Sequence, residues 1–321
     1  MKIDGRSLSL EDARRVLRGE ESAPRLTAAA RKAVRDARAL VVRHADADEA
    51  MYGINTGFGK LSRVRIDADD LERLQENLIL SHAAGTGAPL PDGVARLALL
   101  LRANALARGN SGVRVELLER LLALFGRGVV PIVPEQGSVG ASGDLAPLAH
   151  LALLLIGRGE AKLDGRRMSG ARLAKALALP PLRLQPKEGL ALINGTQVST
   201  ALTVDGVVRA RNLARTVDVA CALTIEALRG SVKAFDARIH GLRDHAGQST
   251  VAANVRRLLK ASRIVKSHAG CDRVQDPYAL RCAPQVHGAA RDAFAHAADV
   301  LTREMNASPT TRSCSRPTTR S

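Results

Sequence analysis

The sequence predicts a mainly α fold whose later part belongs to a bundle of long helices. Leu71, Leu74 and Leu78 recur at a spacing of three to four residues, which places them on one face of a helix. Residues 195–229 form a long segment with apolar side chains on most faces, as expected for a helix that neighbours cover on several sides. The 321 residues suffice for one large domain or two ordinary ones with a core of their own.

The first expected helix, over residues 10–18, carries start signals. Ser9 stands at the N-cap position, and Glu11 and Asp12 lie in the first turn, where negative charge is stabilised. Similar spacing predicts the next helices, which cover residues 24–43, 69–81, 93–108, 113–125 and 144–157. Asp144 and Pro147 suit the start of the last one, because a carboxylate faces the positive end of the helix dipole and proline lacks an N–H.

Extended segments interrupt this helical pattern. Residues 129–134 are β-branched and contain two prolines, which indicates an edge strand or an extended loop. Residues 162–166 resemble a small hairpin, and Pro180-Pro181 marks a break. After the long helix over residues 195–229, one more helix is expected over residues 285–304.

The chain divides by composition into three parts. We expect an N-terminal, mostly helical domain over residues 1–200 and the start of a multi-helix bundle over residues 201–307. Residues 308–321 contain no Ala, Val, Leu or Ile and can bury almost nothing. This tail is therefore expected to have no defined fold.

The net charge of +16 could suit a nucleic-acid partner, but the arginines are scattered along the chain and do not form clusters. Aromatic residues make up only 2%, which argues against a stacking platform for single strands. Apolar runs such as residues 151–156 are too short to cross a bilayer, and the N-terminal residues lack the apolar segment of a signal peptide. The sequence therefore predicts a cytoplasmic protein without nucleic-acid or membrane partners.

The strongest local signal for chemistry is the glycine- and serine-rich stretch over residues 137–144, directly before an expected helix. A tight loop with a helix cap explains this composition, because glycine adopts strained backbone and serine caps helices. A site for an anion or an electrophile is the alternative, since a helix N-terminus stabilises negative charge. Residue types alone leave both interpretations open.

Within this stretch, Ala141-Ser142-Gly143 resembles the signature of the aromatic amino acid ammonia-lyase family. In that family the three residues cyclise autocatalytically into 4-methylidene-imidazol-5-one (MIO) with the loss of two waters. Gly143 offers an unhindered amide nitrogen, and Ser142 supplies a hydroxyl that can be eliminated. The resemblance implies that MIO is the electrophile and that neither a metal nor a dissociable cofactor is needed.

Four further blocks resemble the same family in the same order, and five blocks at consistent spacing are more specific than one motif. They are residues 52–59, 77–87, 194–197 and 275–286. The pair Ser81-His82 is typical of the histidine ammonia-lyases in the family. The resemblance therefore implies elimination of ammonia from L-histidine to give trans-urocanate, the first step of histidine degradation. A tyrosine or phenylalanine ammonia-lyase or aminomutase, and an inactive lyase fragment, remain as alternatives.

The resemblance also implies roles for residues around the electrophile. Tyr52 would remove the β-proton of the substrate, and a tyrosine needs a lowered pKa to act as a base near neutral pH. Asn194 and Tyr278 would hydrogen-bond the MIO group or the reaction intermediate.

Three residues are expected to bind the substrate. His82 would contact the imidazole ring. Arg281 would hold the carboxylate, because a guanidinium pairs with a carboxylate through two parallel hydrogen bonds. Gln275 is a further candidate beside them.

Members of the family are longer than this chain and assemble as homotetramers through the central bundle, with sites built from several subunits. The resemblance thus implies a C-terminal truncation. Codons possible for residues 308–313 encode the usual family continuation when shifted by one base, so we expect the tail to arise from a frameshift. Missing partner helices would expose apolar faces, so we expect the 321-residue chain to aggregate and to show little lyase activity.

Overall fold

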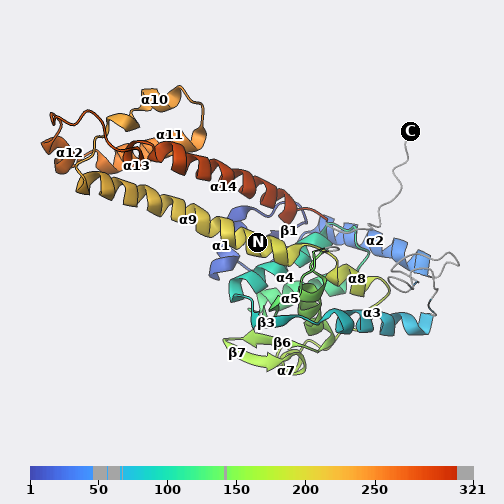
Figure 1. Cartoon of the computed structure of the whole chain (residues 1–321). Helices are drawn as coiled ribbons and strands as arrows, with labels where there is room; N and C mark the ends of the chain where they lie inside the picture. The colour runs from blue at the N-terminus through green and yellow to red at the C-terminus, as the bar shows by residue number, and fades with distance from the viewer. Residues whose placement is uncertain (46–55, 57–65, 67, 141–142, 309–321) are drawn as a thin grey trace, which may run out of the picture. The chain divides into compact units, whose positions relative to one another are not determined.

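The computed structural model describes residues 1–45, 56, 66, 68–140 and 143–308, and it confirms a mainly α fold (Figure 1). It consists of two compact units. Unit 1 comprises Met1–Asp205 and Leu301–Ser321, and unit 2 comprises Gly206–Val300. The domain boundaries expected from the sequence remain a prediction, and the expected tail lies outside the described residues except for Ser308.

Unit 1 contains most of the shorter helices. These are α1 (Leu10–Arg18), α2 (Ala28–Ala45), α3 (Ala68–His82), α4 (Asp92–Ala107), α5 (Val115–Gly126), α6 (Leu145–Leu153), α7 (Gly170–Ala176) and α8 (Glu188–Ile193). Helix α4 is buried along almost its whole length and packs against α1, α2 and α5. Its apolar side chains point in every direction, so α4 forms the centre of the unit 1 core.

Short strands in unit 1 pair into small sheets. β1 (Lys2–Ile3) pairs in parallel with β2 (Arg25–Leu26), and β3 (Thr86–Pro89) pairs antiparallel with β5 (Pro134–Gln136). β4 (Val130–Pro131), β6 (Glu160–Leu163) and β7 (Arg166–Ser169) form an antiparallel sheet in that order. The expected extended stretch and the expected hairpin are therefore both present.

Capping side chains mark where the first two helices begin. Ser9 Oγ accepts from Asp12 N at 3.1 Å, and Asp12 Oδ2 accepts from Ser9 N at 3.0 Å, so the predicted N-cap is confirmed. The predicted start of the second helix at residue 24 is wrong. Residues 25 and 26 form β2, and Thr27 Oγ1 accepts from Ala30 N at 3.2 Å, so α2 begins at Ala28.

Two long helices, α9 (Gln197–Ala227) and α14 (Ala283–Met305), begin and end near the predicted positions. The helix predicted over residues 144–157 is shorter, because α6 ends at Leu153 and continues as the 3₁₀ turn η2 (Leu154–Ile156). Among the described residues, no helix has both the length and the apolar character needed to cross a membrane.

Unit 2 contains most of α9 and α14, which run side by side (Figure 1). The shorter elements between them were not predicted. They are η3 (Lys233–Phe235), α10 (Ala237–Gly241), α11 (Ala246–Leu259), α12 (Arg263–Ser267) and α13 (Tyr278–Arg281). The core of the unit includes Ile225, Phe235 and Val255.

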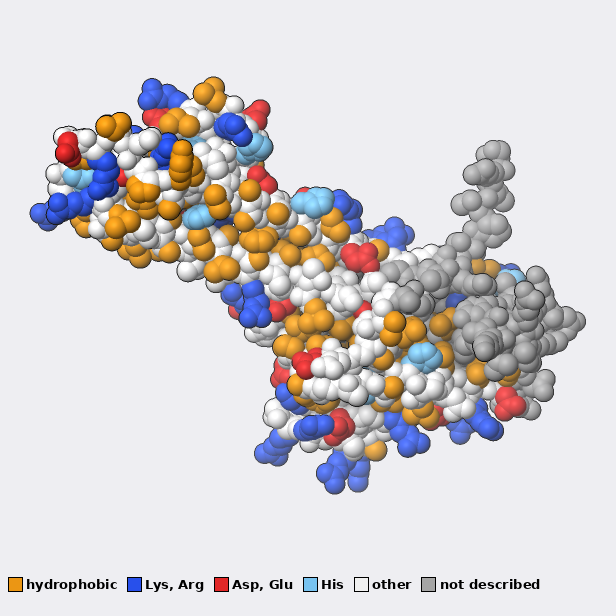
Figure 2. Space-filling view, viewed as in Figure 1, with side chains coloured by type: hydrophobic (Ala, Val, Ile, Leu, Met, Phe, Trp, Pro, Cys, Tyr) orange, Lys and Arg blue, Asp and Glu red, His pale blue; other side chains and the backbone are white. Residues whose placement is uncertain are grey.

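Helix α9 carries apolar side chains that nothing in unit 2 covers. Leu213 is 60% exposed and Leu223 is 62% exposed. Figure 2 shows apolar side chains gathered over the part of unit 2 where α9 lies in Figure 1. The sequence predicted neighbours on several sides of this helix, and within the unit the neighbours cover only some of its faces.

Candidate active site

The glycine- and serine-rich loop ends at Asp144, which is the N-cap residue of α6. The Asp144 side chain is 1% exposed and does not cap its own helix. It accepts hydrogen bonds from Ser138 Oγ at 2.8 Å, Ser199 Oγ at 2.5 Å and Ser199 N at 2.8 Å. The carboxylate therefore ties the start of the loop to the first turn of α9.

Gly143 lies next to Gly195 with almost no space between the two backbones. Its φ is +94°, and a Cβ built on Gly143 would lie 2.4 Å from the Gly195 carbonyl oxygen. Asp144 N donates to the same oxygen at 2.7 Å. Only glycine fits at this position. Ala141, Ser142 and Tyr52 lie outside the described residues.

Asn194 follows the end of α8 and is buried beside the fully buried Arg102 of α4. Arg102 Nη1 donates to Asn194 O at 3.0 Å and to Gln197 Oε1 at 2.7 Å, and its Nη2 donates to Ala191 O. Burial lowers the pKa of Arg102 to about 9, because a low-dielectric surrounding disfavours the charged form. The guanidinium still carries its charge at neutral pH.

His82 is the last residue of α3 and is partly buried. Its Nδ1 lies 2.8 Å from Leu78 O. Because a carbonyl oxygen can only accept, Nδ1 carries the proton, and Nε2 of the neutral ring is an acceptor. The ring thus offers a hydrogen-bond acceptor to a ligand that carries an N–H group.

The segment after His82 lies against the start of the loop. Gly85 N donates to Nε2 of His150 in α6 at 3.0 Å, and a Cβ on Gly137 would lie 3.1 Å from Gly85 Cα. Strand β3 pairs with β5, which leads directly into the loop. Helices α3, α6 and α8 also pack against one another. Unit 1 therefore gathers the His82 segment, Gly143 and Asn194 in one region.

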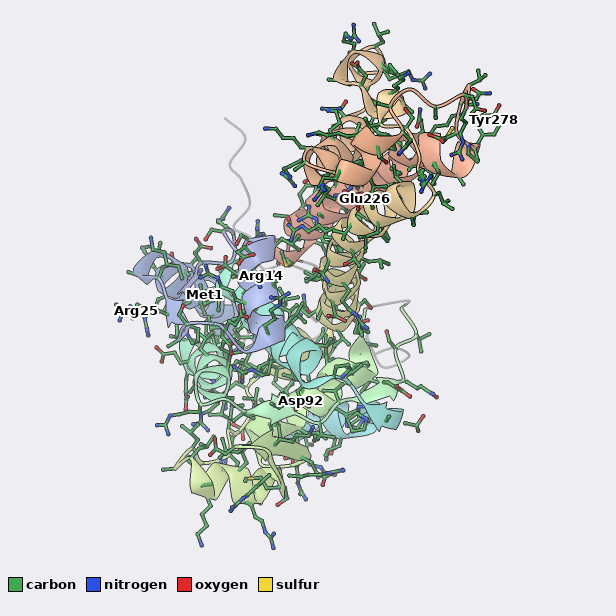
Figure 3. All side chains as sticks on the ribbon, turned by 90° about the vertical axis from the view of Figure 1, so that its left-hand side faces the viewer. Met1, Arg14, Arg25, Asp92, Glu226 and Tyr278 are labelled. Carbon is green, nitrogen blue, oxygen red and sulfur yellow. The ribbon has the colours of Figure 1, made fainter. Side chains whose placement is uncertain are left out.

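Unit 2 holds the second group of predicted residues. Gln275, Tyr278 and Arg281 line an open pocket of about 600 Å³. The Arg281 guanidinium lies 4.4 Å from the centre of the Tyr278 ring, and Tyr278 itself is 71% exposed (Figure 3). Among the described residues, Arg281 Nε has no hydrogen-bond partner. The group combines a cation and a phenol at an accessible surface.

Asp276 holds the segment that carries these three residues. Its side chain is buried, and it accepts from Ser231 N at 2.5 Å and from Arg273 Nη1 at 3.1 Å. The contact with Ser231 connects the segment before α13 to the chain that follows α9, and Arg273 reaches the same chain by donating to Leu228 O and Arg229 O. The segment is therefore fixed although it contains little regular secondary structure.

Sequence reasoning missed three contributors to the unit 1 region: Arg102, the carboxylate of Asp144 as a link between segments, and His150. A signal existed for Arg102, because a charged residue stands between Leu101 and Ala103 in the apolar middle of α4. For Asp144, the local sequence predicted only a position at the start of a helix. Its partner Ser199 lies 55 residues further along the chain. Nothing in the local sequence marks His150 as a partner of Gly85.

Fold and site together define a mainly helical protein with a loop of small residues held beside a buried Asn-Gly turn. A family model described as aromatic amino acid lyase matches residues 8–310. The chain belongs to the aromatic amino acid lyase family.

Known proteins resemble the chain along nearly its whole length. It is 54% identical to the histidine ammonia-lyase of Anaeromyxobacter dehalogenans (strain 2CP-C) over 314 residues, which cover 95% of this chain and 62% of that protein. The crystal structure of tyrosine aminomutase from Streptomyces globisporus matches with a TM-score of 0.89 and 36% identity, over 98% of this chain and 62% of that one. Histidine ammonia-lyase from Trypanosoma cruzi matches with a TM-score of 0.87 and 38% identity, over 97% and 58%. The chain spans less than two thirds of the length of these relatives.

Proposed function

We propose that this protein acts as a histidine ammonia-lyase, converting L-histidine to trans-urocanate and ammonia in the cytoplasm. The observation that carries the proposal is the close approach of Gly143 to Gly195, at the loop whose residue types match the family's MIO signature. Sequence identity of 54% to a histidine ammonia-lyase supports the choice of substrate. The pair Ser81-His82 supports the same choice.

The residues present fit an MIO group, which the family uses. Residues 141–143 have the identities Ala, Ser and Gly, and the position of Gly143 accepts only a residue without a Cβ. The hydrogen bonds of Asp144 fix the backbone on the C-terminal side of Gly143. The group would supply an electrophile that makes the substrate amine a better leaving group.

Individual residues take complementary tasks in this proposal. Nε2 of His82 accepts a hydrogen bond from the N–H of the substrate imidazole. Arg281 pairs with the substrate carboxylate through two hydrogen bonds, and the Tyr278 ring holds its guanidinium in place. Gln275 adds a polar group at the same pocket, and Asn194 lies beside Gly143 at the Asn-Gly turn.

Tyr52 is proposed as the base that takes the β-proton of the substrate, on the strength of the family resemblance of residues 52–59. Phenolate is a strong enough base for a weakly acidic carbon only when the proton is placed directly against it. A Tyr52→Phe variant should therefore bind histidine but form no urocanate.

We further propose that the active enzyme is a homotetramer, the assembly that the family resemblance implies. Leu213 and Leu223 are more than half exposed on α9, and exposed apolar side chains of this size favour burial against other helices. Replacement of Leu223 by Arg should lower the oligomeric mass measured by light scattering. An unchanged mass would contradict this surface as the interface.

Intact mass spectrometry tests the chemistry of the loop directly. The purified chain should be lighter than its encoded sequence by two waters, and Ser142→Ala should restore the encoded mass. Ser7→Ala changes an exposed serine in unit 1 and should keep the loss of two waters. A full encoded mass in the unchanged chain would favour the alternative of an inactive lyase fragment.

A second candidate function is that of an aminomutase or lyase acting on tyrosine or phenylalanine. The structural likeness to tyrosine aminomutase is as high as that to a histidine ammonia-lyase, so the fold does not separate them. Turnover of L-histidine, L-tyrosine and L-phenylalanine should be compared, with urocanate, coumarate or cinnamate, and β-amino acids as products. Turnover of tyrosine or phenylalanine without histidine would replace the main proposal with this one.

A further inference from the structure

Arg102 is a fully buried cation that hydrogen-bonds only uncharged oxygens among the described residues. Its acceptors are the carbonyl oxygens of Asn194 and Ala191 and the side-chain oxygen of Gln197. A buried charge without a counter-charge is unfavourable, because burial removes its hydration. Packing alone therefore does not explain an arginine at this position, since an apolar residue would pack there without that unfavourable burial of charge.

The acceptors of Arg102 lie at the end of α8, in the turn after it and at the first residue of α9. Helix α8 ends at Ile193 and α9 begins at Gln197, and the last carbonyls of a helix have no donors within it. The guanidinium supplies those donors through two nitrogens at once. It thus holds the end of α8 and the start of α9 in a fixed relation.

Gly195 lies inside this turn and is pressed against the guanidinium. A Cβ on Gly195 would lie 2.4 Å from Arg102 Nη1 and 2.3 Å from Gln197 Oε1. The carbonyl of the same glycine contacts the loop, since it accepts from Asp144 N at 2.7 Å and lies against Gly143. Arg102 therefore contacts the peptide that precedes Gly195, and the loop contacts the peptide that follows it.

We propose that Arg102 is a positioning residue for the cyclisation of the loop: it fixes the Asn194–Gln197 turn, whose Gly195 carbonyl accepts from Asp144 N and so holds the backbone that directly follows Gly143. This inference rests on the proposed function. In the cyclisation, Gly143 N forms a bond to the carbonyl carbon of Ala141. The carbonyl oxygen leaves as water with the hydrogens of Gly143 N and Ser142 N. A second water forms from the Ser142 hydroxyl and its α-hydrogen, and no oxidant is needed.

Arg102→Met, Arg102→Lys and Gln197→Leu test this role. Each chain is isolated in denaturant from inclusion bodies, and its encoded mass is verified before it is refolded. The loss of two waters is then followed by intact mass, and thermal unfolding is recorded on the same refolded sample. We expect Arg102→Met to cyclise at least about tenfold more slowly, because small misplacements of reacting atoms cost large rate factors. Lysine keeps the charge but cannot span the three oxygens, so Arg102→Lys should also be slow. Gln197→Leu removes one acceptor and should show an intermediate rate.

Arg96→Met is the matched control on the same helix. Arg96 is also largely buried, pairs with Glu21 and lies 4.6 Å from the centre of the Phe125 ring. Its replacement should lower the melting temperature but leave cyclisation at the normal rate. A purely structural role of Arg102 would give the same pattern as Arg96→Met.

The outcomes separate this inference from the proposed function. If the unchanged chain keeps its encoded mass, the proposed function and this inference both fall. If the unchanged chain loses two waters and folded Arg102→Met or Arg102→Lys loses them equally fast, only the role of Arg102 is overturned. If Arg102→Met does not fold, Arg102→Lys and Gln197→Leu decide, and normal rates in both would overturn the role.

Discussion

Asp144 and Ser199 are joined by two hydrogen bonds, from Ser199 N to Oδ2 at 2.8 Å and from Ser199 Oγ to Oδ1 at 2.5 Å. The contact links the start of α6 to the first turn of α9 across 55 residues of sequence. Hydrogen bonds to a buried carboxylate are stronger than those between neutral groups. The backbone of the loop is thereby anchored just after Gly143.

Ser199→Ala should lower the free energy of unfolding by about 2 kcal/mol, because it removes a hydrogen bond to a buried charge. Urea unfolding measures the change. Ser7→Ala is the matched control, since Ser7 Oγ also donates to a carboxylate, that of Asp4, but at an exposed site. The control should change stability by less than about 0.5 kcal/mol. Equal effects of the two substitutions would show that burial of Asp144 does not strengthen its hydrogen bond with Ser199.

The helices with strong periodicity or clear caps could be predicted from the sequence, as α1 and α3 show. The helices of four or five residues between α9 and α14 could not. Helix α13, for example, has only four residues after Pro277, too few to give a periodic pattern. Such short helices form because tertiary packing, here of Leu280 in the unit 2 core, stabilises them.

The residues of the candidate site were identified through motifs, but the contacts that hold them were not. Arg102 lies 92 residues before its acceptor Asn194, and Asp144 lies 55 before Ser199. Pairings at such separations depend on how α4, α6, α8 and α9 pack, and no local pattern encodes them. The same holds for the hydrogen bond between Gly85 and His150, which joins two different motifs.

Gly143→Ala should destabilise unit 1 by about 3 kcal/mol, the sum of backbone strain at positive φ and overlap with the Gly195 carbonyl. Gly165→Ala isolates the strain, because Gly165 has a φ of +75° and an added methyl group there would meet no atom within 4 Å. The control should cost about 1 kcal/mol. Thermal or urea unfolding compares the two. If Gly143→Ala lowered the free energy of unfolding no more than the control does, the Gly195 peptide would be able to move away from the added methyl group.

His150 should make the stability of unit 1 depend on pH. Burial lowers the pKa of His150 below its usual 6.5, and Nε2 accepts from Gly85 N only while the ring is neutral. Because the folded-state pKa is lowered, the contribution is complete above pH 6.5 and is lost as the pH falls through the folded-state value. His150→Gln keeps an acceptor that does not titrate. Melting temperatures at about pH 8 and about pH 5 should therefore differ less in this variant than in the unchanged chain. Identical pH dependence in both would exclude His150 as the cause.

In unit 2, the buried carboxylate of Asp218 on α9 connects α9 to two other helices. Its Oδ2 accepts from Arg291 Nη2 of α14 at 2.5 Å and from Asn254 Nδ2 of α11 at 2.7 Å. Arg291 Nη2 also donates to Ala214 O at 2.8 Å. Removal of one member of a buried pair leaves the other charge unpaired, so Asp218→Ala should cost about 3 to 5 kcal/mol.

A double-mutant cycle separates the interaction between Asp218 and Arg291 from the packing that each substitution removes. Arg291→Met in the Asp218→Ala background should cost at least about 1 kcal/mol less than in the unchanged chain, because the charge it removes is already unpaired. The comparison pair is Asp236–Arg238, where Arg238 is 90% exposed and Arg238→Met should change stability by less than about 0.5 kcal/mol. Additive losses in the cycle would show that Asp218 and Arg291 stabilise unit 2 independently. Coupled losses would identify the pair as the link that holds α9 against α14.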